Sequence, residues 1–460
     1  MSTVDACARY VMLIAVVATA LPAAAQTRSR AAATAAVDSI VARALQGGKA
    51  AGMSVGVVQG RDTLVLKGYG FADLEFDVPT PDRAVYEIGS VTKQFTASSI
   101  LLLQERGQLS LDDPITKYLP SYPTQGHVIT IRRLLDHTSG IKGYTELPEF
   151  GNFMRRHEPR DSLVALFSTK PFDFESGDDM IYNNSAYFLL GLIIEKVSGM
   201  PYADFVQKNL FDKAGMSDSR YCSENAIVKR RAHGYDMSAT GLVRAAYLDH
   251  LWPYAAGSLC STAGDLVAWN RALHGGKILS PASYREITTP GTLNDGSRLR
   301  YAKGLAVHEL AGHRVIEHGG GINGFLSSSN YLPDDDAIIV VLVNSAGPVA
   351  PDAIAGQIAE AVFGAKAPGS QAFSGDLSKF AGTYGGAGRG RPMTLTIGAD
   401  SGKLTVLTVG PGGSTPRAAR YVGDDTFQIG ETRYAFVTES GRVTGLRVDG
   451  VYGYSHLKRQ

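Results

Sequence analysis

The sequence predicts a mixed α/β (α+β) protein: an antiparallel β-sheet flanked by helices with an all-helical insertion, then a small antiparallel β-barrel-like domain. Three observations support this fold class. Strand patterns near residues 55 and 340 bracket a middle region, about 90 to 290, in which helical patterns dominate. Residues 376–460 change to short alternating segments separated by turns. The length of 460 residues allows two or three domains, and the 44% apolar content supplies a buried core.

Residues 1–25 are predicted to be a signal peptide rather than part of the fold. Arg9 precedes an apolar run, and the alanines at 23–25 offer an A-x-A cleavage site before Gln26. The run is too short for a comfortable transmembrane helix, although an uncleaved anchor is the alternative. We therefore expect a periplasmic or secreted protein, cleaved near Ala25, with no stable membrane span afterwards.

Strand patterns occur at both ends of the first large domain, residues 26–365. Residues 52–69 form two alternating apolar segments joined by a polar turn at 59–62. Further strands are predicted at 304–309, 314–318, 322–332 and 336–344. Because these segments lie on either side of the helical region, we expect one antiparallel sheet assembled from both ends, with helices packed against it.

Helix signals are clear at several places. One helical segment ends at Gly107, a second at Gly199 and a third at Gly275, and glycine is a common residue at a helix end. A further helix is predicted near 351–363. The middle region is therefore expected to form the all-helical insertion.

A linker and a second domain follow the last of these helices. Residues 366–375 are rich in Gly, Pro, Ser and Ala, which is typical of a linker. In residues 376–460 the alternating segments are interrupted by turns such as "GPGG" and "ESG". This pattern predicts a small antiparallel sandwich or barrel, and no catalytic cluster stands out in it.

Charge and metal-ligand spacing exclude several classes of function. The 45 basic and 44 acidic residues give a net charge of +1 without long runs of one sign, so neither a nucleic acid nor an anionic membrane is an expected partner. The histidines show no H-x-x-x-H or H-E-x-x-H spacing, so no metal site is expected. In an exported protein Cys222 and Cys260 form either a disulfide or two buried thiols, and the sequence leaves both open.

Two familiar motifs occur in contexts that do not support them. Residues 52–56 match the G-x-S-x-G nucleophile elbow, but Ser54 lies in an apolar strand pattern with no helix after it. Residues 319–324 match the G-x-G-x-x-G dinucleotide fingerprint, but strands follow where a helix is required. We therefore expect neither an elbow serine nor a dinucleotide cofactor.

The pattern S-x-x-K provides a stronger candidate nucleophile. It occurs at residues 90/93, 139/142 and 455/458. A serine needs a neighbouring base to become a nucleophile, and the i, i+3 spacing would place Ser90 and Lys93 on one face of a helix. At a helix N-terminus the backbone N–H groups favour a developing oxyanion. The same positive end of the helix disfavours the charged form of a buried lysine. Only this pair precedes a long helical segment. The second pair is expected in a loop, and the third in the last turn of the chain.

Two further elements have a chemistry that complements this serine. Tyr182 and Asn184 form a Y-x-N pattern just before a helix. A phenol whose pKa is lowered by a nearby ammonium group can move a proton between Ser90 and a leaving group, although a capping turn is the alternative. In the segment "HGGG", which begins at His318, glycines on a strand edge would give a bound acyl compound a close approach to the backbone.

The motifs S-x-x-K, Y-x-N and H-x-G occur in this order, and with them the chain resembles the serine β-lactamase and penicillin-binding protein superfamily. The tyrosine makes it similar to the class C branch, which groups class C β-lactamases with DD-peptidases, D-aminopeptidases and carboxylesterases. The resemblance covers about residues 40–365, including "LSLDDPITKYLP" and "IRRLLDHTSGI", and implies a β-lactamase/transpeptidase-like fold. Residues 376–460 resemble the lipocalin-like domain of some D-aminopeptidases and related proteins.

The resemblance implies a role for each residue of the first two motifs. Ser90 would be the acylated nucleophile. Lys93 and Tyr182 would share the general-base and general-acid roles, and which of them takes the first proton stays open. Asn184 would bind the substrate amide.

The resemblance also gives roles to the third motif. His318 and Gly320 would line the substrate strand, an edge strand facing the nucleophile. The backbone N–H groups of Ser90 and Gly321 would form the oxyanion hole, a contribution of about 3–4 kcal/mol per donor. Many relatives carry Lys-Thr-Gly here. Because a histidine of pKa ~6.5 is mostly neutral at pH 7, we expect weaker carboxylate recognition and no efficient β-lactamase activity.

The sequence thus predicts an exported serine hydrolase that cleaves an amide or ester bond through an acyl-enzyme, without metal or cofactor. The expected substrate is a small molecule or a short peptide. A peptidase-like activity of the D-aminopeptidase or DD-peptidase type is favoured, followed by a carboxylesterase and then a class C-like β-lactamase. The alternative from another class is a penicillin-binding receptor with little turnover. The physiological substrate and the oligomeric state stay open.

Overall fold

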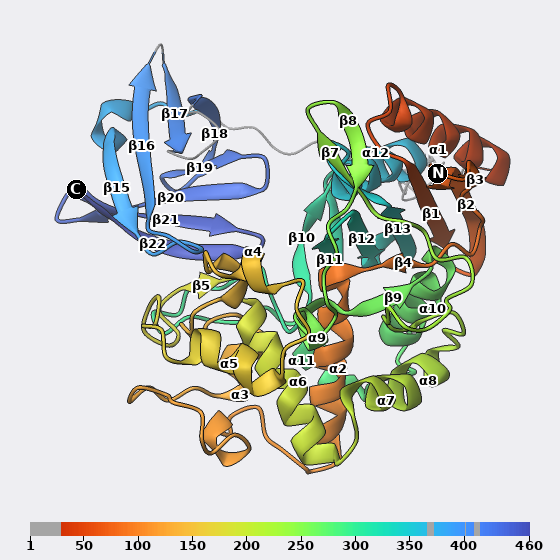
Figure 1. Ribbon diagram of the computed structural model, residues 1–460. Coiled ribbons are helices and arrows are strands. Elements are labelled where there is room, and N and C mark those ends of the chain that lie inside the picture. The colour runs from red at the N-terminus through yellow and green to blue at the C-terminus, as the bar shows by residue number, and fades with distance from the viewer. Residues whose placement is uncertain (1–28, 366–371, 401, 409–414) are drawn as a thin grey trace, which may run out of the picture.

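The computed structural model describes residues 29–365, 372–400, 402–408 and 415–460 (Figure 1). The predicted signal peptide, residues 1–25, and residues 366–371 of the predicted linker lie outside these ranges. Within the described ranges no helix is both long and apolar enough to cross a bilayer. The described chain contains a seven-stranded sheet flanked by helices, a helical region beneath it in Figure 1, and a closed β-barrel near the C-terminus.

The central sheet is antiparallel and has the order β10-β11-β12-β13-β1-β2-β3. Strands from residues 306–343 therefore pair with strands from residues 52–79, which confirms a sheet assembled from both ends. The strands are β1 (Gly52–Gln59), β2 (Asp62–Asp73), β3 (Val78–Pro79), β10 (Ala306–Leu310), β11 (His313–Ile322), β12 (Phe325–Leu332) and β13 (Ala337–Val343).

Alternate residues of the central strands supply two separate cores, one on each face of the sheet. The helices that cover the sheet are α1 (Arg30–Leu45), α12 (Pro351–Phe363), α2 (Thr92–Glu105) and α10 (Ala263–His274). Val55 and Val341 are register partners across β1 and β13, and both pack in the core that includes α1 and α12. Val340 belongs to the opposite core, with α2 and α10. Because strand side chains alternate between faces, β13 is apolar along its whole length.

The helices predicted for the middle region are present with the expected ends. α2 ends just before Gly107, α10 ends just before Gly275, and α6 (Asn184–Ser198) ends at Gly199, whose backbone is left-handed. The other helices of this region are α3 (Ile131–Leu135), α4 (Phe150–Phe153), α5 (Arg160–Ser168), α7 (Tyr202–Val206), α8 (Asp212–Ala214), α9 (Tyr254–Gly257) and α11 (Pro281–Thr288). The short strands of this region are β4 (Tyr86–Glu87), β5 (Met180–Ile181), β6 (Arg220–Tyr221), β7 (Tyr235–Ser238), β8 (Gly241–Arg244) and β9 (Leu259–Ser261). A further short strand, β14 (Ser345–Ala346), follows β13.

Cys222 and Cys260 form a disulfide, which decides between the two alternatives that the sequence leaves open. The bond closes a segment in which the two cysteines are 38 positions apart, and it lies beside the paired strands β6 and β9. In the chain-entropy model, a cross-link that closes a loop of this size stabilises the fold by about 4 kcal/mol, because it restricts the unfolded chain.

The C-terminal strands form a closed barrel, one of the two architectures that the sequence predicts. β15 pairs with both β16 and β22, which closes the ring. Its interior is filled by side chains such as Phe380, Phe427 and Phe436. The strands are β15 (Gly382–Gly386), β16 (Met393–Asp400), β17 (Lys403–Thr408), β18 (Arg417–Gly423), β19 (Thr426–Ile429), β20 (Thr432–Glu439), β21 (Arg442–Gly450) and β22 (Gly453–Arg459).

The barrel packs directly against the helical region (Figure 1). β22 pairs with β5 through Tyr454 and Met180, so the barrel sheet continues into the dipeptide that precedes Tyr182. An ion pair between Arg300 and Asp449, 3.1 Å apart, links the same two parts of the chain. The barrel is therefore joined by backbone hydrogen bonds to a segment that carries a predicted site residue.

Candidate active site

Ser90 and Lys93 meet at the N-terminal end of α2, as the sequence predicts. Ser90 lies in a 3₁₀ turn, η1 (Gly89–Val91), immediately before the helix. The Lys93 Nζ atom is 3.0 Å from Ser90 Oγ. It also donates to Asn184 Oδ1 and to the carbonyl oxygen of Ala256, each at 2.8 Å. The amine is fully buried and is held by one hydroxyl group and two carbonyl oxygens.

The surroundings of Lys93 favour the neutral amine. Burial lowers the pKa of Lys93 well below its usual value, and the positive charge of Arg389 lowers it further, while Glu146 opposes part of this effect. A neutral amine has two hydrogens and one lone pair. The two carbonyl acceptors match the hydrogens, which leaves the lone pair for Ser90 Oγ.

The other two S-x-x-K sequences lack this arrangement. Lys142 forms an ion pair with Asp173 at 2.5 Å, in the loop expected for the second pair. Ser455 lies inside β22 and not in a turn, because the alternating pattern continues almost to the end of the chain. Ser54 of the apparent nucleophile elbow is buried inside β1, 3.0 Å from the Tyr86 hydroxyl.

Tyr182 lies beside the lysine, but its protonation differs from the prediction. The Lys93 Nζ atom is 4.7 Å from the centre of the Tyr182 ring. Burial raises the pKa of Tyr182, and the contact with Ser90 and the charge of Arg389 offset only part of this rise. The expected lowering by an ammonium group is therefore wrong. The physical reason is that burial also favours the uncharged form of Lys93.

Asn184 both contacts the lysine and lines the cleft. Its Oδ1 accepts from Lys93, and its Nδ2 donates to Thr145 Oγ1 at 3.1 Å. Its neighbour Asn183 is the helix cap, since Asn183 Oδ1 accepts from the N–H of Ala186 at 3.0 Å. The capping turn and the site residue thus occur together, and Asn184 holds Lys93 in place while also lining the cleft.

The glycine segment lies in β11, which is not an edge strand of the sheet as expected. β10 covers the first half of β11, and its pairing ends where Ala306 meets Glu317. Residues 318–322 extend beyond β10 and so have one free edge, which lies against η1. The break predicted between strands at 318 and 322 is wrong, because the hairpin turn comes later, at Asn323 and Gly324.

The free edge of β11 directs backbone N–H groups towards the nucleophile turn. The N–H of Gly319 donates to the Tyr452 hydroxyl at 2.9 Å. N–H groups alternate in direction along a strand, so that of Gly321 points to the same side. A Cβ atom at Gly89 would lie 2.9 Å from the Gly321 nitrogen, and Gly89 has a positive φ of 50°. Two glycines therefore allow the turn and the strand to approach this closely.

Gly320 is required by packing against the turn that carries Ser90. A Cβ at Gly320 would collide with the carbonyl oxygen of Ile88 and with Ser327 Oγ. That serine already donates to the Ile88 oxygen at 2.8 Å. A Cβ at Gly319, one residue earlier, would meet nothing closer than 3.6 Å. Neighbouring glycines of one strand therefore tolerate a methyl group very differently.

His318 is buried and uncharged. Its Nδ1 is 2.5 Å from the Gly319 carbonyl oxygen, and the Tyr301 hydroxyl donates to its Nε2 at 2.9 Å. Burial, followed by the nearby Lys93, lowers the pKa of His318 to about 4. The sequence predicts a mostly neutral histidine. At pH 7 the imidazole presents no positive charge to a substrate.

Two cavities meet at Ser90. The larger, about 480 Å³, is lined by Ser90, Tyr182, Asn184, His318, the three glycines 319–321, Arg389 and Tyr452. The smaller, about 120 Å³, is lined by Ser90, Asn184 and Gly321 together with Tyr144, Phe150 and Leu248. All seven residues predicted for the site thus lie at or beside one cleft. Arg389 and Tyr452 were missed, because they belong to the barrel and carry no sequence motif.

Comparison with known proteins places this geometry in a family. The β-lactamase family model matches residues 37–363, about seven tenths of the chain. The chain belongs to the β-lactamase family. Penicillin-binding protein 4* of Bacillus subtilis (strain 168) is 30% identical over 306 residues, which are 62% of this chain and 66% of that protein. The β-lactamase-family chain thus spans just under two thirds of this relative's length.

Solved structures give the same assignment. The D-stereospecific amidohydrolase from Streptomyces sp. is 28% identical with a TM-score of 0.61, and the match covers 73% of this chain and 99% of that one. The D-amino acid amidase from Ochrobactrum anthropi SV3 is 26% identical with a TM-score of 0.62, over 72% and 98%. The octameric penicillin-binding protein homologue from Pyrococcus abyssi, 24% identical, shares the fold over 92% of this chain, with a TM-score of 0.65. These three solved proteins share the fold of this β-lactamase-family chain.

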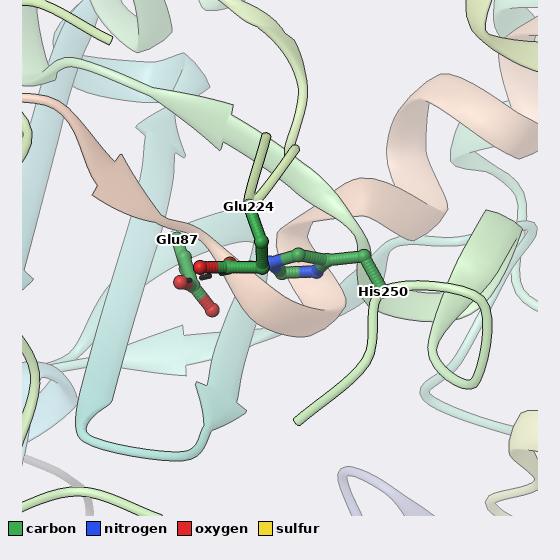
Figure 2. Close-up of side chains that lie close together, drawn as sticks. All are labelled: Glu87, Glu224 and His250. Atoms are coloured by element: carbon green, nitrogen blue, oxygen red, sulfur yellow. Dashed lines mark ion pairs between the residues drawn. The ribbon is translucent and has the colours of Figure 1, made fainter. Parts of the chain in front are cut away.

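A second group of charged side chains in this β-lactamase-family chain is shown in Figure 2, and one of them, Glu87, precedes Ser90 by three residues. Glu87, Glu224 and His250 come close enough together to be considered as metal ligands. Arg231, however, already forms ion pairs with both carboxylates, at 2.9 and 2.6 Å. Burial would lower the pKa of His250, but Glu224 and Glu87 outweigh it and raise the pKa to about 9. A protonated imidazole is not a ligand, so the arrangement is an ion-pair cluster.

Gly320→Ala should lower kcat/KM roughly 100-fold, because a displaced Ile88 carbonyl shifts the Ser90 turn relative to the Gly321 N–H. Gly319→Ala is the matched control and should leave kcat/KM nearly unchanged, since its methyl group meets only ordinary contacts. Both are measured with a chromogenic ester. Equal effects of the two substitutions would contradict this account of the glycine strand.

The His250 cluster should make stability depend on pH in the alkaline range. Because the folded pKa is raised from 6.5 to about 9, its contribution is complete below pH 6.5 and is lost as the pH rises to about 9. At pH 6.5 the wild type should therefore have a higher free energy of unfolding than His250→Gln. This advantage should shrink by on the order of 2–3 kcal/mol between pH 6.5 and pH 9.5. Urea unfolding at both pH values measures the difference, and a pH-independent difference would contradict the assignment.

Proposed function

We propose that this β-lactamase-family chain is an exported serine hydrolase that cleaves an amide or ester bond of a short peptide through an acyl-enzyme on Ser90. The observation that carries the proposal is the buried Lys93 amine, 3.0 Å from the serine oxygen. A serine becomes a nucleophile when a neighbouring base accepts its proton, and an amine with a lowered pKa is such a base at neutral pH.

In the proposed first step, neutral Lys93 accepts the proton of Ser90 as Oγ bonds to the acyl carbon of the substrate. The negative charge that develops on the acyl oxygen is stabilised by the N–H groups of Ser90 and Gly321. Such donors contribute about 3–4 kcal/mol each when they are fixed in advance. The contacts of Lys93 with Asn184 and Ala256 keep the amine oriented for this transfer.

The leaving group then requires a proton, and Tyr182 is the proposed donor. Its raised pKa keeps the phenol protonated at neutral pH, so it acts as an acid rather than as the first base. The Lys93 ammonium formed in the first step lies 4.7 Å from the centre of its ring. A positive charge at this distance favours proton release from the phenol to the leaving nitrogen or oxygen. The Lys93 ammonium then returns a proton to the Tyr182 phenolate, so that both groups are again neutral. Water attacks the acyl-enzyme, Lys93 takes the proton of the water, and this proton passes to Ser90 Oγ as the acyl group leaves.

The names of two similar proteins support D-amino-acid substrates for this chain. Two of the solved relatives are described as a D-stereospecific amidohydrolase and a D-amino acid amidase. A curated relative is described as a penicillin-binding protein, which keeps a slowly deacylating receptor as the second candidate. The neutral His318 argues against strong β-lactam carboxylate binding at that residue. We therefore propose a peptidase-like enzyme, with an esterase as its nearest variant.

Export is part of the proposal. The apolar N-terminal segment with its alanine cleavage site supports a secretory signal, and the Cys222–Cys260 disulfide supports an oxidising compartment. A periplasmic or secreted enzyme would meet short peptides rather than nucleic acids.

Ser90→Ala should lower turnover of a p-nitrophenyl ester, a D-alanyl anilide and nitrocefin at least about 1000-fold, because the acyl-enzyme cannot form. Ser455→Ala, which removes the serine of an S-x-x-K sequence in the barrel, is the matched control and should keep wild-type rates. Intact-mass spectra of the wild type during reaction with the p-nitrophenyl ester separate the two candidates. Rapid recovery of the free mass supports the enzyme, and a lasting adduct on Ser90 supports the receptor. Retained activity in Ser90→Ala would rule out the site.

A further inference from the structure

The barrel supplies a cation to the catalytic cleft. Arg389 lies in the loop between β15 and β16, and its guanidinium carbon is 5.2 Å from the centre of the Tyr182 ring. The residue lines the same 480 Å³ cavity as Ser90. We infer that Arg389 binds a carboxylate on the leaving group, so that the barrel selects peptides with a free carboxyl group next to the scissile bond. The inference rests on the proposed function and narrows its substrate class.

The position of the leaving group follows from the proton donor. The larger cavity contains both Ser90 and Tyr182, whereas the smaller contains Ser90 without Tyr182. A leaving nitrogen must contact the group that protonates it, so it enters the larger cavity. The acyl part of the substrate then occupies the smaller cavity, which is lined by apolar side chains such as Phe150 and Leu248. Arg389 is therefore on the leaving-group side of Ser90.

Arg389 is the group in this cavity that is suited to a carboxylate. His318 is neutral at pH 7, and the Lys93 amine is buried among protein oxygens. A guanidinium group stays charged at every physiological pH and presents a planar set of donors. The Arg389 side chain is 50% exposed, so a substrate can reach it. The acidic side chain of Asp352, in the first turn of α12, also lines this cavity. Binding of a carboxylate therefore depends on Arg389.

The arginine is held in place by the helical region. Its Nε and Nη2 atoms lie 2.7 and 2.6 Å from Glu146 Oε1. The same oxygen accepts from Thr145 Oγ1 at 2.8 Å, and that hydroxyl contacts Asn184. Within the described part of the chain, Nη1 of Arg389 donates to no acceptor, so this side of the guanidinium group is available to bind a substrate carboxylate. A loop of the barrel is thus fixed, through a chain of hydrogen bonds, relative to the lysine that Asn184 holds.

The proposed reaction is the release of a C-terminal amino acid, as in a carboxypeptidase. The bond from Ser90 Oγ to the acyl carbon forms and the carbon–nitrogen bond breaks, while the nitrogen takes a proton from Tyr182. The product is an amino acid whose carboxylate remains at Arg389 until it leaves. An amino-acid amide, which loses ammonia, would make no use of this contact. The barrel therefore favours peptides with a free terminus over simple amides.

The test compares N-acetyl-D-alanyl-D-alanine with its C-terminal amide, which differ only in the carboxylate. Release of D-alanine or D-alaninamide is followed by chromatography. Arg389→Gln should lower kcat/KM for the free acid about 10- to 100-fold, mainly through KM, because charge-assisted hydrogen bonds are lost. The amide should change little. Arg389→Lys, which keeps the charge without the fork, should retain part of the preference for the acid.

Arg391→Gln is the matched control, since Arg391 lies in the same loop and is exposed. It should leave both substrates unchanged. An equal loss on acid and amide in Arg389→Gln would overturn the inference, because removal of a positive charge near Lys93 affects every substrate alike. Thermal melting of each variant shows whether it is folded, and an unfolded Arg389→Gln leaves Arg389→Lys to decide.

Failure of the inference is distinguishable from failure of the proposed function. If the wild type cleaves neither peptide nor a p-nitrophenyl ester, and no adduct forms on Ser90, the proposed function is wrong. If the wild type cleaves the acid and the amide equally well, Ser90 chemistry stands and only the role of Arg389 is overturned.

Discussion

The burial of one amine organises this site. Lys93 is enclosed with Ser90 Oγ, Asn184 Oδ1 and the Ala256 carbonyl as its partners, and the loss of solvent lowers its pKa. The same desolvation raises the pKa of Tyr182, so one physical effect prepares a base and an acid next to each other. η1 supplies the serine, α2 supplies the lysine, and α6 supplies the asparagine. The cores around these helices therefore fix the protonation states on which the proposed chemistry depends.

The barrel is joined to this arrangement rather than attached at a distance. β22 pairs with β5, which leads into Tyr182, and the Tyr452 hydroxyl accepts from the N–H of Gly319 on β11, the strand of the proposed oxyanion donor. Arg389 lies over the Tyr182 ring in the same cavity and is paired with Glu146. Two loops of the barrel thus line the cavity that contains Ser90.

Much of the fold and the site could be predicted, because the signals are local. Helix ends at glycines, alternating strands and the i, i+3 spacing of Ser90 and Lys93 depend on neighbouring residues. The raised pKa of Tyr182 could not be predicted, because it depends on burial by distant segments. The partial edge of β11 was missed because it depends on where β10 ends, at Ala306. Arg389 and Tyr452 were missed because only the docking of the barrel brings them to the cleft.

Titration of the Lys93 amine shows directly whether burial makes it a base at neutral pH. The enzyme is labelled with ¹³C at the lysine side-chain carbon next to the amine, and the signal of Lys93 is assigned as the one that disappears in Lys93→Arg. NMR spectra recorded across the pH range then give its midpoint. We expect a midpoint well below the ordinary lysine value of 10.5. A midpoint at or above 10.5, in an enzyme that is active at neutral pH, would contradict it.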